Sequence, residues 1–224
     1  MKHQLPLSFQ APENATFDNF FAGQNQQLVF SLKNDDEPLI FLWGDPGSGK
    51  SHLLQALAAQ YQTRGKNAIY IPLQLDDDFT PELLDGLEFM ELVCLDDIHN
   101  IVGNAAWEEA MFHFFNRIRE HGGRLILAAN NGALNLGIRL PDLRSRLSWG
   151  VTYQVQAAGD KEKIQVLKLR AHQRGFEISD EVANYLMKRA TREMSDLMAL
   201  LDKLDYASLV EQRKLTIPFI KNYL

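Results

Sequence analysis

The stretch Gly44-Asp45-Pro46-Gly47-Ser48-Gly49-Lys50-Ser51 decides the fold of this 224-residue chain. It fits the pattern G-x-x-x-x-G-K-S, and it lies between a short apolar run at residues 39–43 and a segment with leucines at helical spacing at residues 50–61. Glycines let the main chain curl so that its N–H groups face a phosphate. The helix that follows presents its positive end to the same anion. The stretch therefore predicts a phosphate-binding loop between a buried strand and a helix.

Individual residues of this loop have expected roles. Lys50 is placed to reach the β- and γ-phosphates of a nucleotide, and the hydroxyl of Ser51 to hold Mg²⁺. The expected nucleotide-binding residues of the loop are Gly44, Gly47, Ser48, Gly49, Lys50 and Ser51.

Four more short apolar runs, at residues 68–71, 92–95, 124–129 and 151–155, alternate with helical patterns along the first part of the chain. Strands that alternate with helices form parallel sheets covered on both faces. After Ala157 the apolar residues recur only at helical spacing. The sequence thus predicts an α/β domain with a five-stranded parallel sheet at residues 16–157, a small all-α subdomain at residues 158–224, and a flexible tail at residues 1–15.

Polar residues follow two of the predicted strands. Asp96 and Asp97 end the third strand, and Asn130 follows the fourth. Because the carboxyl ends of parallel strands line the ligand crevice, Asp96 is expected to join Ser51 at the Mg²⁺ ion, and Asp97 to orient or deprotonate an attacking water. Asn130 could position that water or the γ-phosphate. A solvated turn is the alternative for each of these residues.

Two groups of arginines have two interpretations each. Arg139, Arg144 and Arg146 precede the fifth strand, where one of them could reach a phosphate on a neighbouring molecule, or all could be solvated. Arg192 begins a helix of the C-terminal subdomain, where it could contact the nucleotide or form an ordinary surface ion pair. The residues alone leave these choices open.

The composition excludes several classes of protein. A net charge of −6 argues against a domain that coats nucleic acid, so no strong direct DNA binding is expected. The single cysteine, Cys94, excludes a disulfide framework within the chain. The chain has neither an apolar run of about 20 residues nor a signal-peptide pattern. The six histidines lack metal-ligand spacing. We expect a cytoplasmic protein without membrane contact, and no metal beyond nucleotide-bound Mg²⁺.

In combination these motifs resemble the AAA+ module of the bacterial replication initiator DnaA. Residues 44–51 resemble its Walker A motif, and Asp96-Asp97-Ile98 its Walker B motif. Asn130 falls at the sensor 1 position, where the initiator family has an acid. The segment Leu143–Arg146, followed by Trp149-Gly150, looks like the family's box VII, which makes Arg146 an arginine finger. The resemblance also places Arg192 at sensor 2 and extends over residues 16–224.

Two differences from DnaA point to the related Hda family of regulators that inactivate DnaA. No DNA-binding domain follows the lid in this sequence. The hexapeptide Gln4-Leu5-Pro6-Leu7-Ser8-Phe9 resembles a motif that binds the sliding clamp, the β subunit of DNA polymerase III. Its amide anchor and apolar side chains assign clamp contacts to Gln4, Leu5, Leu7 and Phe9.

The resemblance implies a function in trans. The tail docks on the DNA-loaded clamp, the module holds ADP or another nucleoside diphosphate, and Arg146 stimulates ATP hydrolysis on the ATP form of DnaA, which prevents re-initiation. Intrinsic ATPase activity is then weak or absent. Self-association as a homodimer or larger assembly is expected, since AAA+ modules bind nucleotide near subunit interfaces. The alternatives are a self-contained AAA+ ATPase that acts as a helicase loader, or a DnaA-like initiator fragment.

Overall fold

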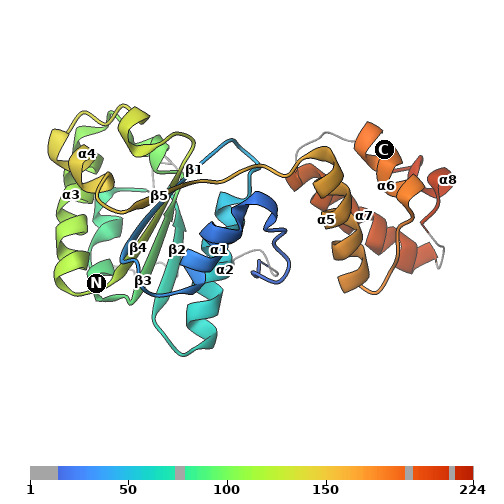
Figure 1. The fold of residues 1–224 in the computed structure, drawn as a ribbon, viewed down its shortest axis with the longest axis horizontal. Coiled ribbons are helices and arrows are strands. Elements are labelled where there is room, and N and C mark those ends of the chain that lie inside the picture. Colours follow the sequence, from blue (N-terminus) through green and yellow to red (C-terminus); the bar gives the residue numbers. More distant parts are fainter. Residues whose placement is uncertain (1–14, 74–78, 190–193, 212–214, 224) are drawn as a thin grey trace, which may run out of the picture. The chain divides into compact units, whose positions relative to one another are not determined.

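A computed structural model describes residues 15–73, 79–189, 194–211 and 215–223 (Figure 1). The chain forms two compact units, and each is described by itself. One contains residues 24–156, with the segment that ends at Phe17, and the other contains residues 18–23 and 157–224. Among the described residues, no helix combines the length and the apolar character needed to cross a bilayer.

The first unit is built on a five-stranded, all-parallel sheet with the order β2-β3-β4-β1-β5, which confirms the predicted fold class. The central strands are continuous apolar runs because both of their faces are covered, and every residue of β3 and β4 is buried. The five strands are β1 (Leu39–Trp43), β2 (Ala68–Pro72), β3 (Leu92–Asp96), β4 (Arg124–Ala129) and β5 (Val151–Gln154).

Helices cover both faces of this sheet. Figure 1 shows α1 (Gln26–Lys33) and α2 (Lys50–Thr63) on one side, and α3 (Ala105–Glu120) and α4 (Pro141–Leu147) on the other. An extensive apolar core lies between the sheet and α3 and α4. Short 3₁₀ helices complete the unit: Pro81–Leu84, Leu87–Phe89, Ile98–Ile101 and Ala133–Asn135. A further 3₁₀ helix, Gly23–Asn25, begins in the range of the second unit.

The side chain of Arg124, at the start of β4, fastens α1 to the sheet. The side chain is 5% exposed, and its guanidinium donates hydrogen bonds of 2.9 Å to four carbonyl oxygens, which belong to Ser31, Leu32, Asn34 and Glu37. These carbonyls belong to the last turn of α1 and the loop that follows it, where a helix leaves its carbonyls without internal partners. One buried cation thus satisfies them and fixes the approach to β1.

The second unit is helical. Its helices are α5 (Asp160–Gln173), α6 (Asp180–Arg189), α7 (Met194–Glu211) and α8 (Ile217–Ile220). They enclose a separate apolar core that includes Leu167, Leu186, Leu201 and Phe219. Because this core is complete within the unit, the helices form a subdomain of their own.

Candidate functional site

The phosphate loop connects β1 to α2, and its geometry requires glycine. Gly47 and Gly49 have φ angles of 73° and 100°, in the left-handed region that side chains disfavour. Gly44 is needed for a different reason, because a Cβ there would lie 2.5 Å from the carbonyl oxygen of Val155. The loop is therefore a curled main chain packed closely against Val155, the residue after β5, and followed directly by a helix amino terminus.

Lys50 points back into this loop. Its ammonium donates hydrogen bonds to the carbonyl oxygens of Gly44 at 2.8 Å and Asp45 at 2.9 Å, and the residue is only 7% exposed. Burial lowers the pKa of Lys50, while the nearby carboxylates of Asp96, Asp97 and Asp45 oppose that shift. An ammonium has three donors, so one remains for an anion in the loop.

Ser48 provides a second sign that the loop fits phosphate. Its side-chain oxygen is buried and has no hydrogen-bond partner among the described residues. A buried hydroxyl normally finds a partner, because leaving it unpaired costs about 1–3 kcal/mol. A phosphate oxygen held in the loop would satisfy it. The loop residues thus fit a nucleotide.

Asp96 lies at the carboxyl end of β3 and is fully buried. Its carboxylate accepts hydrogen bonds from the hydroxyl of Tyr70 at 3.0 Å and from the backbone N–H of Asp97 at 2.9 Å. Burial first, and then the Asp96 charge, raise the pKa of Tyr70, and hydrogen bonds with the side chains of Gln55 and Ser51 oppose that shift. Tyr70 therefore holds one expected Mg²⁺ ligand, Asp96, and lies near the other, Ser51. Sequence reasoning missed this residue.

Asp97 has the only positive φ angle, 55°, of any described residue other than glycine. Such strained positions are concentrated at functional sites. Burial, followed by the charge of Asp96, raises the pKa of Asp97, while His99 and Lys50 act in the opposite direction. The Nδ1 atom of His99 lies 3.9 Å from the Asp97 carboxylate. A half-buried carboxylate of raised pKa beside the loop lysine can accept a proton or orient a water.

Asn130 follows β4 and is exposed. Asn131 donates a weak 3.4 Å hydrogen bond to its side-chain oxygen. The N–H of Gly44 donates to the carbonyl of Ala129 at 3.3 Å, so Asn130 directly follows a residue that is bonded to the loop. The structure thus brings Gly44, Asp96 and Asn130 to the same carboxyl edge of the sheet.

Arg146 lies at the opposite, amino edge of the sheet. It stands in the last turn of α4, five residues before Val151, which begins β5 and pairs with Ile40 at the start of β1. The five residues of β1 separate this edge from the loop, and at roughly 3.3 Å per residue they span about 13 Å. The structure therefore does not bring Arg146 to the nucleotide loop of its own chain.

The three arginines before β5 differ in their surroundings. Arg144 is exposed, and the guanidinium of Arg139 faces Gly103. Arg146 is half-buried, and its guanidinium carbon lies 5.4 Å from the centre of the Trp149 ring. Only Arg146 is thus held against an aromatic ring at the surface.

Glu108 is a further residue that sequence reasoning missed. It is 2% exposed, and its carboxylate accepts hydrogen bonds from the N–H groups of Gly103 at 2.8 Å, Arg139 at 3.0 Å and Leu140 at 2.8 Å. Leu140 directly precedes α4, so Glu108 ties the start of α4 to α3. The available signal was an acid in line with Met111 on the apolar face of a helix.

Some expected site residues lie outside the described part of the chain. These are the clamp-binding residues Gln4, Leu5, Leu7 and Phe9, and Arg192 of the lid. Among the described residues, no group of three or more histidine, cysteine, aspartate or glutamate side chains could hold a metal ion by itself. Cys94 is buried, and burial raises the pKa of its thiol.

Comparison with protein families matches nearly the whole chain in two segments. Residues 12–154 match the bacterial DnaA ATPase domain, and residues 160–224 match the lid domain of Hda. An uncharacterised protein of Haemophilus influenzae is 46% identical over 229 residues, with 100% of this chain and 99% of that protein aligned.

Solved structures of DnaA share the fold. DnaA from Aquifex aeolicus with bound AMPPCP has a TM-score of 0.71 at 24% identity, covering 88% of this chain and 66% of that one, so this chain spans about two thirds of its length. Domain III of DnaA from Thermotoga maritima has a TM-score of 0.78 at 16% identity, covering 95% and 96%. The AAA+ fold of this family binds nucleotide with Mg²⁺. The chain belongs to the DnaA-related family of AAA+ regulators that join a bacterial DnaA ATPase domain to an Hda lid.

Proposed function

We propose that this protein inactivates the initiator DnaA by stimulating the hydrolysis of ATP bound to DnaA, with Arg146 acting as an arginine finger in trans. The observation that supports this most strongly is the position of Arg146 at the edge of the sheet opposite its own phosphate loop. A guanidinium at that edge has no nucleotide of its own within reach, so its natural target is a nucleotide on a neighbouring AAA+ module. An arginine finger in trans contributes ~10³–10⁵ in rate in GTPases.

In this proposal the chain's own site holds ADP or another nucleoside diphosphate. Lys50 and the N–H groups of the loop bind the phosphates, Ser48 donates to one of their oxygens, and Ser51 and Asp96 would hold Mg²⁺. Mg²⁺ would supply charge neutralisation of the phosphates. The bound nucleotide orders the module, so that α4 presents Arg146 to DnaA.

The decisive experiment follows the ATP that remains on DnaA over time, in the presence of clamp-loaded DNA, with and without this protein. We expect the wild-type chain to accelerate the loss of ATP, and Arg146→Ala to abolish that acceleration while retaining nucleotide and clamp binding. Arg144→Ala is the matched control, because it removes an exposed arginine from the same helix. Full stimulation by Arg146→Ala would remove the finger assignment.

Docking on the sliding clamp is supported by residues 4–9 alone. The amide of Gln4 and the apolar side chains of Leu5, Leu7 and Phe9 suit an apolar pocket on the clamp. Gln4→Ala combined with Leu7→Ala should abolish capture of the clamp and leave nucleotide binding intact. Undiminished capture by this double variant would contradict the assignment.

A self-contained ATPase is the second candidate, and the Asp97 carboxylate favours it. This carboxylate has a raised pKa and lies close enough to Lys50 for their charges to interact, as a base for hydrolysis in cis would require. Turnover of ATP by the purified chain without DnaA separates the two candidates. Sustained turnover that depends on Asp97 would favour the self-contained enzyme.

A further inference from the structure

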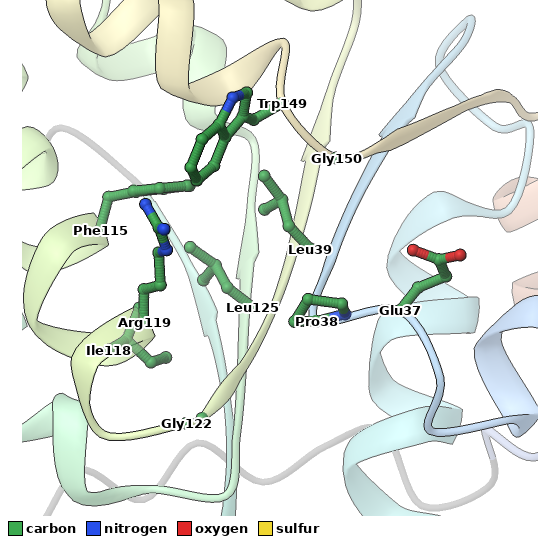
Figure 2. A pocket seen from close by; sticks show the side chains of 11 residues that line it. Glu37, Pro38, Leu39, Phe115, Ile118, Arg119, Gly122, Leu125, Trp149 and Gly150 are labelled. Carbon is green, nitrogen blue, oxygen red and sulfur yellow. The ribbon is translucent and has the colours of Figure 1, made fainter.

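A groove of about 190 Å³ lies at the amino edge of the sheet, on the side away from the phosphate loop (Figure 2). Its apolar walls come from the starts of β1 and β4 and from the end of α3: Leu39, Leu125, Phe115 and Ile118. Trp149 stands at its rim. This apolar hollow is open to solvent in the isolated chain.

Two glycines fix the shape of the groove. A Cβ at Gly150 would lie 2.3 Å from the carbonyl oxygen of Leu39, and a Cβ at Gly123 would lie 2.8 Å from that of Met90. Neither position tolerates a side chain without movement of the main chain. The groove is therefore set by main-chain packing, and a partner would meet a preformed surface.

Two arginine side chains pack against the indole ring of Trp149. The indole is 59% exposed, and the guanidinium carbons of Arg119 and Arg146 lie 4.1 Å and 5.4 Å from the centre of its ring. Neither arginine forms an ion pair with a carboxylate in the part of the chain that the structure describes. Glu37 also lines the groove, but Figure 2 shows it at the far end from Arg119. The rim is thus locally cationic in a chain of net charge −6.

These properties identify the chemistry of the occupant. An acidic side chain would neutralise Arg119, and an apolar neighbour would bury itself in the groove against Trp149. Single-stranded nucleic acid also binds arginine and tryptophan, but it needs an open aromatic face on which a base can stack. The guanidinium groups of Arg119 and Arg146 both lie over the Trp149 ring, and the chain carries a net charge of −6, which disfavours nucleic acid. The surface therefore favours a protein partner.

The position of Arg146 identifies that partner. Because Arg146 contacts the same ring as Arg119, any module close enough to receive Arg146 would also cover Trp149. We propose that Arg119, Trp149 and the adjoining groove bind the AAA+ module whose nucleotide Arg146 contacts. An acidic side chain of that module would pair with Arg119, and an apolar one would fill the groove. This inference rests on the proposed function, since that module is ATP-bound DnaA. It adds a binding surface that is distinct from the finger.

The experiment measures two quantities for each variant: direct binding to ATP-bound DnaA, and the protein concentration that gives half-maximal stimulation of ATP hydrolysis. We expect Trp149→Ala and Arg119→Glu to raise the dissociation constant for ATP-bound DnaA and the half-maximal concentration roughly tenfold or more, as for the central residues of an interface. Trp149→Phe should recover much of the loss. The matched controls are Phe30→Ala, at a 66%-exposed aromatic on α1, and Arg64→Glu, after α2; both should behave as wild type.

Nucleotide affinity and thermal unfolding, measured in parallel, separate a lost surface from a damaged fold. If Trp149→Ala and Arg119→Glu fold normally and still bind DnaA as tightly as wild type, the inference is overturned. Absence of DnaA binding by the wild-type chain would also overturn it. Binding without stimulation would contradict the proposed function and leave the surface standing. If the two variants lose binding to a single-stranded oligonucleotide that the wild-type chain binds, and their DnaA binding is unchanged, the surface belongs to nucleic acid instead.

Discussion

At the residue scale, the hydroxyl of Tyr70 holds the fully buried carboxylate of Asp96 in one orientation. A buried carboxylate needs such partners, because an unpaired charge in the core is costly. Ser51, the other expected Mg²⁺ ligand, lies near the same hydroxyl. The main contribution of Tyr70 should therefore be to the metal-dependent part of nucleotide binding.

Replacing Tyr70 with phenylalanine tests this role. We expect Tyr70→Phe to weaken the affinity for ADP about fivefold when Mg²⁺ is present, which corresponds to one hydrogen bond of about 1 kcal/mol, and to leave binding in EDTA unchanged. Calorimetric titration under both conditions measures the difference. Tyr153→Phe is the control, because it removes the 2.6 Å hydrogen bond with Ser31 in another part of the unit. An equal loss with and without Mg²⁺ would indicate a purely structural role.

Asp97 combines strain with an unfavourable charge. Its φ of 55° is disfavoured for most side chains, and burial raises its pKa above the ordinary value of 3.8. A carboxyl group whose pKa is raised in the folded state binds its proton more tightly there than in the unfolded chain. Its contribution to stability therefore falls as the pH rises from about the unfolded value through the folded one.

We therefore expect Asp97→Asn to stabilise the protein at neutral pH, because asparagine is uncharged and tolerates a left-handed backbone. An increase in melting temperature of about 2 °C is of the expected size for a chain of this length. Thermal unfolding followed between pH 7 and pH 4 should show the advantage over wild type shrinking as the pH falls. The conservative control Asp45→Asn, in the loop, should not raise the melting temperature. An advantage for Asp97→Asn that grows toward low pH would contradict the assigned shift.

At the element scale, a single side chain of β4 determines how α1 meets the sheet. Arg124 donates to carbonyls of the α1 end and its loop, and also lies 3.4 Å from the Asp35 carboxylate and the Tyr61 hydroxyl. Removing it would leave several buried acceptors without donors. The amino edge of the sheet depends on this connection, since the loop that Arg124 binds leads into the start of β1.

We expect Arg124→Met to lower the free energy of unfolding by roughly 3–5 kcal/mol, the usual loss when one partner of a buried charged network is removed. Denaturant titration would measure it. Arg64→Met, at the end of α2, removes an exposed arginine and should change stability by less than about 0.5 kcal/mol. A loss of similar size in both variants would show that the Arg124 network adds nothing beyond general packing.

Local patterns predicted the elements better than their connections. All five strands were predicted, because each is an apolar run or an apolar run that ends in polar residues. The predicted and observed strand ends differ by one residue at most, as at Val155, which lies just outside β5. The roles of Arg124 and Glu108 were not predictable from the sequence. Their partners are backbone groups that lie in loops or far away along the chain. The sequence places Trp149 only in a motif. Its contacts with two arginines depend on how α3 and α4 pack, which no local pattern specifies.

At the scale of the whole molecule, nucleotide binding should appear as a gain in stability. A ligand that binds only the folded state at 100 times its dissociation constant adds about 2.7 kcal/mol. For a chain of 224 residues this corresponds to an increase in melting temperature of about 5–10 °C. We expect ADP with Mg²⁺ to produce it in the wild-type protein but not in Lys50→Ala, which lacks the ammonium that faces the loop.

Differential scanning fluorimetry across an ADP series provides the measurement. Lys66→Ala is the matched control, because its ammonium pairs with Asp35 far from the loop. The control should respond to ADP as wild type does. A wild-type chain that gains no stability from any nucleoside diphosphate or triphosphate would contradict nucleotide binding itself.

The placement of Arg146 and the phosphate loop at opposite sheet edges gives the molecule a direction. Contacts that join one edge of a module to the other edge of the next are head-to-tail, and they add subunits along an axis without closing into a symmetric pair. A row of such modules has two chemically different ends. At one end this chain would present Arg146 to the nucleotide of its neighbour, and at the other end it would present only its own phosphate loop. Its effect on a growing row of DnaA would therefore depend on which end it joins.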